Sequence, residues 1–267
     1  MTHPAHAAHS VKRIDSRDNS LVKLLRRLSA QSSAYRKLGQ FWVEGGHLCR
    51  AARESGVDVA IAVFADSFWS AHGAAWADCA RRMVVIPDAL FDEISTLESA
   101  ARIGFVIDLP AAPVLQRGVA SVVLDRLQDA GNVGSILRSA AAFGFRQVLS
   151  LTGSAALWSP KVLRAGMGAH FALDMVEGLA TSDIQGLGVP LIVTSSHHGQ
   201  LLQQGVLPWP CAWVLGHEGQ GVCEALLVAA ALSVRIGQPG AGESLNVAAA
   251  AAICLHASAL ARAKAAP

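Results

Sequence analysis

The chain has 267 residues, of which 52% are hydrophobic and 16% are charged, and its formal net charge is +2. This length accommodates one large domain or two modest ones, and the apolar share supplies ample material for a core. A net charge this small does not by itself indicate a class of partner, so the distribution of charge along the chain matters more.

The cysteines and the apolar stretches exclude several classes of protein. The five cysteines are scattered and contain no C-x-x-C pair, which indicates reduced thiols and neither a zinc site nor any other metal site. The first ten residues have no apolar core of a secretory signal, so we expect a cytoplasmic protein. Leu245–Ala263 is mostly alanine and contains His256 and Arg262, which favours a helix of a soluble domain over a membrane span.

Residues 1–37 are predicted to form a disordered tail and a basic helical arm. Val11–Lys37 contains eight basic residues and two acidic ones, and leucines recur at helical spacing from Leu21 to Leu28. Such a helix could be a solvated face of a docking element or an arm that contacts phosphates, and the pattern alone leaves both open.

Residues 38–110 are predicted to form a small α/β domain. The expected strands are Phe41–Val43, Val57–Ala65, Met83–Pro87 and Ile103–Leu109. Between them, one helix is expected after Gly46 and up to Glu54, and two more at Phe68–Cys79 and Asp88–Leu97. Pro110 and Pro113 then interrupt regular structure, so residues 111–119 are predicted to be a linker.

Residues 120–267 alternate between strands and helices, which predicts a largely parallel sheet covered on both faces. The expected strands are Ser121–Asp125, Gln147–Leu151, Leu191–Ser195, Ala212–Leu215 and Leu232–Ile236. The expected helices are Ser135–Phe143, Pro160–Met167, Glu224–Ala229 and Leu245–Ala263. In such sheets ligands bind at the carboxyl ends of the strands.

The first polar segment at those ends is Asp129–Arg138. It carries two glycines, and Asn132 or Ser135 is predicted to cap the helix that follows. The spacing is not G-x-G-x-x-G and no acidic residue follows at the required offset, which disfavours a dinucleotide site. A capped helix with a salt-bridged Arg138 is the alternative interpretation.

The second polar segment is Val214–Gly221, with three glycines in six residues and an acidic residue, Glu218, among them. It is either a loop that lies against a ligand or a simple strand-to-helix turn. His217 is a candidate general base by residue type.

The third polar segment is Ile236–Asn246, which precedes the alanine-rich helix. Ser244 is predicted to be the N-cap of that helix. A cap explains Ser244 alone but not the whole glycine-rich run.

Together these segments resemble the signature motifs of the SpoU family, also called the TrmH family, of RNA 2′-O-ribose methyltransferases in the SPOUT superfamily. The matching residues are Asn132, Gly134 and Arg138, then Gly216, Glu218, Gly219 and Gly221, and finally Ser244–Val247. The resemblance extends from about Ala120 to the C-terminus, and Phe41–Gly46 with its basic lead-in is similar to the family's substrate-binding domain, which resembles an RNA-binding fold of ribosomal proteins.

The resemblance implies an α/β protein whose C-terminal SPOUT domain contains a deep trefoil knot, and a homodimer. It implies that S-adenosyl-L-methionine is held by main-chain groups of Gly216, Ile236 and Leu245. It implies a catalytic set of Arg138, Asn132, Glu218, Ser244 and Asn246. The basic residues expected to contact RNA are Arg26, Arg27, Arg36 and Lys37.

The implied activity is transfer of a methyl group to a ribose 2′-hydroxyl, in ribosomal RNA in preference to transfer RNA. A base methyltransferase of the same superfamily, a transfer RNA 2′-O-methyltransferase and a non-catalytic RNA-binding protein are the alternatives. Ala130, His217 and Gly237 depart from the family pattern, which has proline, asparagine and proline there. Because His217 replaces a residue that does not titrate, it is not assigned as a base.

Overall fold

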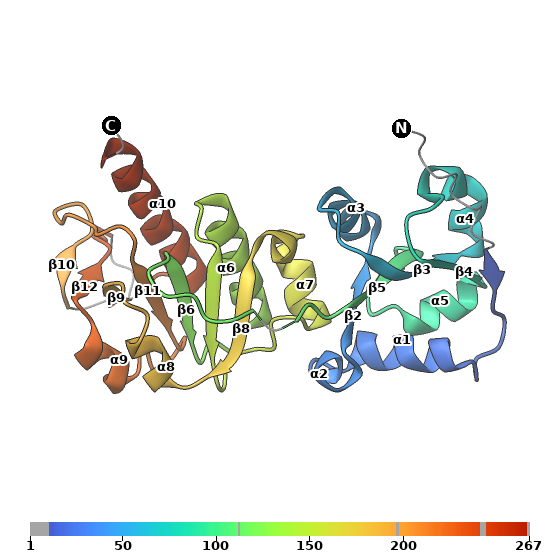
Figure 1. Cartoon of the computed structure of the whole chain (residues 1–267), viewed down its shortest axis with the longest axis horizontal. Coiled ribbons are helices and arrows are strands. Elements are labelled where there is room, and N and C mark those ends of the chain that lie inside the picture. Colours follow the sequence, from blue (N-terminus) through green and yellow to red (C-terminus); the bar gives the residue numbers. More distant parts are fainter. Residues whose placement is uncertain (1–10, 112, 196–197, 241–243, 266–267) are drawn as a thin grey trace. The chain divides into compact units, whose positions relative to one another are not determined.

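The computed structural model describes residues 11–111, 113–195, 198–240 and 244–265. The described chain divides into two compact units (Figure 1). Unit 1 contains the described residues up to Pro110 together with Trp158–Phe171, and unit 2 contains the remainder.

Unit 1 is built on a mixed sheet with the strand order β1-β4-β3-β5-β2. Its strands are β1 (Lys12–Arg13), β2 (Gln40–Glu44), β3 (Val59–Ala65), β4 (Arg82–Ile86) and β5 (Ile103–Asp108). β4 pairs in parallel with β1 and β3, whereas β5 pairs antiparallel with β3 and β2.

Helices cover both faces of this sheet because alternate strand residues point to opposite sides. The helices are α1 (Ser20–Ala30), α2 (Ala34–Leu38), α3 (Gly46–Glu54), α4 (Asp66–His72), η1 (Gly73–Trp76), α5 (Asp88–Ile94) and α7 (Pro160–Gly166), followed by η2 (Ala169–Ala172) at the end of the unit. Val63, Val84 and Val106 face α1 and α5, and Phe105 faces the other side, where it meets Trp76.

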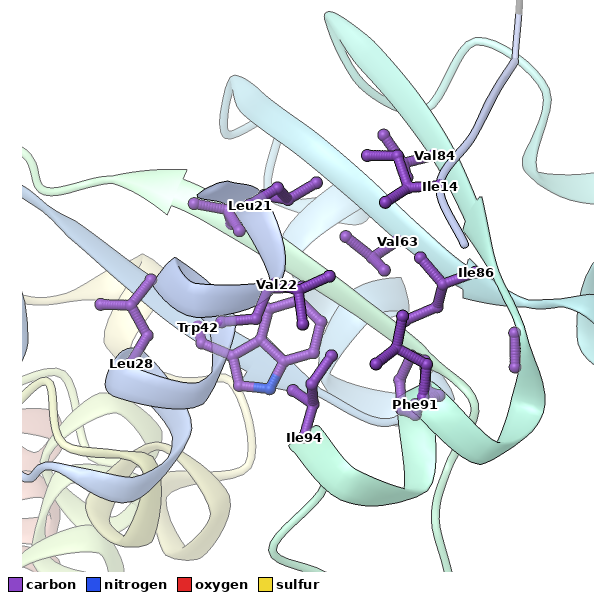
Figure 2. Packing of buried hydrophobic residues seen from close by; sticks show 14 of the residues in the cluster. Ile14, Leu21, Val22, Leu28, Trp42, Val63, Val84, Ile86, Phe91 and Ile94 are labelled. Atoms are coloured by element: carbon purple, nitrogen blue, oxygen red, sulfur yellow. The ribbon is translucent and has the colours of Figure 1, made fainter. Parts of the chain in front are cut away.

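The basic segment is not a separate arm, which corrects the prediction for the described part of residues 1–37. Ile14, Leu21, Val22 and Leu28 are buried in one core cluster with Trp42 and Phe91 of the domain (Figure 2). The leucine repeat therefore forms the inner face of α1, and its basic side chains occupy the outer face. Residues 1–10 lie outside the described part of the chain.

Trp158–Phe171 also differs from the prediction, which placed it in the second domain. The ring of Trp158 lies 4.5 Å from that of Phe41, centroid to centroid, and Arg164 Nη1 donates to Thr96 Oγ1 at 2.9 Å. The predicted helix is present as α7, but its apolar face packs on β2. A local helical pattern does not say which of two cores receives that face.

Unit 2 confirms the parallel sheet. Its strand order is β10-β12-β9-β11-β6-β7-β8, and every neighbouring pair is parallel. The strands are β6 (Ser121–Asp125), β7 (Gln147–Leu151), β8 (Asp174–Leu179), β9 (Leu191–Thr194), β10 (Gln200–Leu201), β11 (Ala212–Gly216) and β12 (Leu232–Arg235). The sequence prediction missed β8 and β10, which are an irregular strand and a two-residue strand.

Among the residues that the structure describes, two helices cover each face of this sheet. α6 (Ala130–Ala142) and α10 (Val247–Ala265) pack together on one side, and α8 (Thr181–Gln185) and α9 (Glu224–Ala229) lie on the other. α10 is attached to β11 through Trp213, which is fully buried and donates its Nε1–H to Ser258 Oγ at 2.8 Å. None of the described helices is long and apolar enough to cross a membrane. The trefoil knot stays a prediction.

Candidate active site

The helix that carries Asn132 begins at Ala130, five residues before the predicted start at Ser135. Asp129 is its N-cap, because its side chain accepts a hydrogen bond from the Asn132 amide at 2.7 Å. Gly131 leaves room for this cap, since a Cβ there would lie 3.0 Å from Asp129 Oδ1. Glycines have poor helix propensity, so the sequence pattern hides the first turn.

The second polar segment is a closed hairpin rather than a simple turn. The His217 amide donates to the Gly221 carbonyl at 3.0 Å, and the Gly221 amide donates back at 2.8 Å. Only glycine fits at position 216, because a Cβ there would lie 2.2 Å from the carbonyl carbon of Gly221. The hairpin therefore folds directly onto the end of β11.

His217 stabilises this hairpin through its ring. Its Nδ1 accepts hydrogen bonds from the amides of Gly219 at 3.0 Å and Gln220 at 3.3 Å. An asparagine Oδ1 makes the same contact with the amide two residues on in an Asx turn. His217 therefore replaces the expected asparagine in a structural role, and its Nδ1 lone pair is already engaged.

Glu218 connects the hairpin to the start of α6. One carboxylate oxygen accepts from the Asp129 amide at 3.2 Å and the other from the Gln128 amide at 3.3 Å. Partial burial raises the pKa of Glu218, but hydrogen bonds to its own amide, Asn132 and these amides outweigh it, so the pKa lies below its ordinary value. Glu218 is thus held as an anion against the N-terminal end of a helix, where negative charge is stabilised.

The three polar segments meet in one row of hydrogen bonds. Asn132 Nδ2 donates to Glu218 Oε1 at 3.2 Å, and Asn246 Nδ2 donates to Asn132 Oδ1 at 2.9 Å. This Asn246–Asn132–Glu218 row contains one residue from each predicted motif. The convergence is tertiary, because β9 separates β12 from β11 in the sheet.

Asn246 also caps α10, which corrects the prediction for Ser244. Asn246 Oδ1 accepts from the amides of Ala248 at 2.9 Å and Ala249 at 3.3 Å, and α10 begins at Val247. Ser244 lies exposed two residues too early to reach those amides. Asparagine serves as well as serine at this position, so local preference could not choose between them.

Arg138 lies further along α6 and is exposed. Within the described part of the chain it has neither a hydrogen bond nor an ion pair. The structure thus does not join Arg138 to Asn132. Its guanidinium is available to a ligand.

The residues expected to hold the cofactor are at the ends of β11 and β12 and just before α10. Gly216 is buried, Ile236 is half-buried, and Leu245 is 39% exposed. Main-chain donors and acceptors flanked by glycines and apolar side chains fit an adenine nucleoside, which such groups can recognise. Asn246 joins the Leu245 segment to Asn132 of α6, whereas the path from Ile236 runs through residues 241–243, outside the described chain.

The sequence analysis missed Asp125, Arg126 and Gln220. The Asp125 side chain is fully buried at the end of β6 and accepts from Arg126 Nε at 2.8 Å. Arg126 Nη1 in turn donates to Gln220 Oε1 at 3.0 Å. An acidic residue that ends an apolar strand was the available signal, because a buried carboxylate requires a partner.

The four predicted RNA-binding residues differ in their surroundings. Arg26 is engaged by Glu93, with Nη2 2.6 Å from Oε2, and the guanidinium of Arg36 lies 5.4 Å from the centroid of the Tyr35 ring. Arg27 and Lys37 are exposed and, among the described residues, form no ion pair. No cluster of three or more potential metal ligands occurs among the described residues.

Comparison with known proteins identifies the family. The model of the SpoU rRNA Methylase family matches residues 120–256. The chain belongs to this family. The resemblance inferred from the motifs is confirmed, and the chain is an rRNA methyltransferase of the SpoU type.

Similarity to individual relatives extends over almost the whole chain. The 23S rRNA (guanosine(2553)-2′-O)-methyltransferase RlmP of Bacillus subtilis (strain 168) is 29% identical over 250 residues, covering 92% of this chain and 98% of that protein. The structure of an RNA 2′-O ribose methyltransferase is 27% identical, covers 94% of this chain and 99% of its own, and has a TM-score of 0.76. An AdoMet-bound rRNA methyltransferase from Sinorhizobium meliloti shares the fold, with 24% identity, a TM-score of 0.80, and coverage of 96% of this chain and 99% of its own.

Proposed function

We propose that this chain transfers the methyl group of S-adenosylmethionine to a ribose 2′-hydroxyl of ribosomal RNA. The observation that carries the proposal is the Asn246–Asn132–Glu218 row, which joins the three motifs at one place. The names of the Bacillus relative and of the 27% identical structure specify 2′-O methylation, and the Sinorhizobium structure binds AdoMet in the same fold. The reaction is carried over from them, but not the nucleotide.

Arg138 is proposed to act as a charged clamp. When bound, S-adenosylmethionine supplies an electrophilic methyl group on a positively charged sulfur. The chain must then align a ribose oxygen with that methyl and stabilise the negative charge that develops on the oxygen. Deprotonating an arginine at pH 7 costs on the order of 7 kcal/mol, so a guanidinium is a poor base. A charged Arg138 can instead grip the neighbouring phosphate and stabilise the oxyanion.

The hydrogen-bonded row is proposed to orient the reacting groups. Asn132 receives a hydrogen bond from Asn246 and donates one to Glu218, so both ends of its amide group are fixed. An amide held in this way can orient a ribose without reorganising during the reaction. Ser244 is exposed two residues before Asn246, and its assigned role is to fix the third polar segment and to contact the substrate.

RNA recognition is assigned to four basic residues of unit 1. Arg27, Arg36 and Lys37 are exposed, and Arg26 is half-buried and paired with Glu93. We further propose a homodimer, as the family resemblance implies. The inner face of α10 buries Leu255, whereas Ile253 and Leu260 are 41% and 49% exposed. This outer stripe is available to a second copy. We place the activity in the cytoplasm.

The proposal is tested by incubating the purified full-length chain with methyl-labelled S-adenosylmethionine and either ribosomal RNA or transfer RNA. Digestion to nucleosides and mass spectrometry then locate the label, with Arg138→Ala as the inactive control. We expect a 2′-O-methylnucleoside from ribosomal RNA. A methylated base, or label in transfer RNA alone, contradicts the proposal, and RNA binding without any label supports the non-catalytic alternative.

A further inference from the structure

Arg126 has a backbone conformation that arginine rarely adopts. It directly follows β6, and its φ is +60°, in the left-handed region that favours glycine, asparagine and aspartate. Such a conformation is strained for arginine and persists only where the surroundings compensate for it. The contacts of the Arg126 side chain can stabilise this backbone conformation.

The Arg126 guanidinium joins the sheet to the hairpin. Its Nε and Nη2 donate to the two oxygens of the fully buried Asp125 carboxylate, at 2.8 and 3.4 Å. Its Nη1 donates to Gln220 Oε1 at 3.0 Å, and Nη2 also lies 3.4 Å from the Gly221 carbonyl. The Asp125 carboxylate also accepts a hydrogen bond from the amide of Cys223, two residues after the hairpin, at 2.6 Å.

These bonds hold the opposite side of the hairpin from Glu218. Glu218 fixes one side to Gln128 and Asp129, while Arg126 fixes the other through Gln220 and Gly221. The hydrogen bonds that Arg126 donates to the Asp125 carboxylate raise the pKa of Arg126 above its already high ordinary value, so its guanidinium is charged at neutral pH.

We propose that Arg126, held by Asp125, is a positioning residue that sets the hairpin and thereby the place of Glu218 in the Asn246–Asn132–Glu218 row. It acts through Gln220 and Gly221 and does not itself contact RNA or cofactor. The expected effect of Arg126 on catalysis rests on the proposed function of that row. Its effect on the order of the hairpin is independent of that function.

The first test measures hydrogen exchange of the hairpin amides in the full chain. Arg126→Asn keeps a residue that tolerates the left-handed backbone but removes the guanidinium, and Arg146→Asn is the matched control. Arg146 is an exposed arginine immediately before β7, which is the parallel neighbour of β6, so it lies at the amino-terminal end of the strands whereas Arg126 lies at their carboxyl end. We expect faster exchange in residues 217–221 for Arg126→Asn only. Unchanged exchange in that variant overturns the proposal, whether or not the chain methylates RNA.

The second test measures kcat and KM for methylation of ribosomal RNA. We expect Arg126→Asn to lower kcat on the order of 10- to 100-fold with little change in KM for RNA, since displaced catalytic groups mainly affect kcat. In a Glu218→Gln background the same substitution should cost much less, because both changes act on one element. A raised KM with wild-type kcat overturns the positioning role of Arg126. Effects of Arg126→Asn and Glu218→Gln on kcat that multiply fully in the double variant also overturn it.

Discussion

Replacing Glu218 by glutamine tests the hydrogen-bonded row with the smallest change of shape. The carboxylate accepts hydrogen bonds from the amides of Gln128 and Asp129 and from Asn132 Nδ2, at 3.2 to 3.3 Å. A glutamine can keep its oxygen on Asp129 and Asn132, but its NH₂ group then faces the Gln128 N–H. One acceptor is lost and two donors are opposed.

The magnitude follows from the bonds that are lost. A hydrogen bond to a charged group contributes about 1.5–3 kcal/mol, but the bonds here are long and the side chain is exposed, which reduces that value. We therefore expect Glu218→Gln to lower the free energy of unfolding by about 1 kcal/mol at neutral pH. We expect a much larger loss in kcat, because Asn132 loses the charge that fixes its amide.

The contribution of Glu218 to the free energy of unfolding depends on pH. The folded-state pKa of Glu218 lies below its ordinary value, so its contribution to stability is complete above the unfolded-state pKa and is lost as the pH falls through the folded-state pKa. Urea unfolding of wild type and variant from pH 7 to pH 3 should therefore show two curves that converge on acidification. A stability difference that grows towards low pH, or a variant with wild-type kcat, would refute the reasoning.

Four further outcomes are expected. Arg138→Lys should retain cooperative unfolding but lose at least about tenfold in kcat, because an ammonium lacks the planar fork that grips a phosphate, and near-wild-type turnover would argue against the clamp. His217→Asn should leave the pH–rate profile unchanged, since an asparagine can accept from the same amides, and a lost ionisation would identify His217 as a base. Asn246→Ala should reduce the free energy of unfolding by about 1 kcal/mol through the lost cap of α10 and also lower kcat, whereas an effect on stability alone would make it a cap only. Replacing both Arg27 and Lys37 by glutamine should weaken RNA binding and reduce the slope of log K against log salt by about 0.7 per lost phosphate contact, and an unchanged slope would remove this surface from RNA recognition.

Much of the fold was predictable because it is locally encoded. The strands β6 and β7 and the helix α9 have the predicted bounds, since apolar runs bounded by polar residues and glycines identify buried strands and short helices without reference to the rest of the chain. The three motifs were recognisable for the same reason, because each is a contiguous string at the carboxyl end of a strand. Family, reaction type and cofactor follow from those strings.

The tertiary structure decided what those strings do to one another. Asn246 meets Asn132 across 114 positions of sequence, and Arg126 meets Gln220 across 94. Such contacts depend on the order of strands in the sheet, which residue preferences do not determine. The same holds for α7, whose apolar face packs in unit 1, and for α1, whose leucines are core rather than arm. Local composition tells which face of an element is apolar, but only the complete set of long-range contacts decides what covers it.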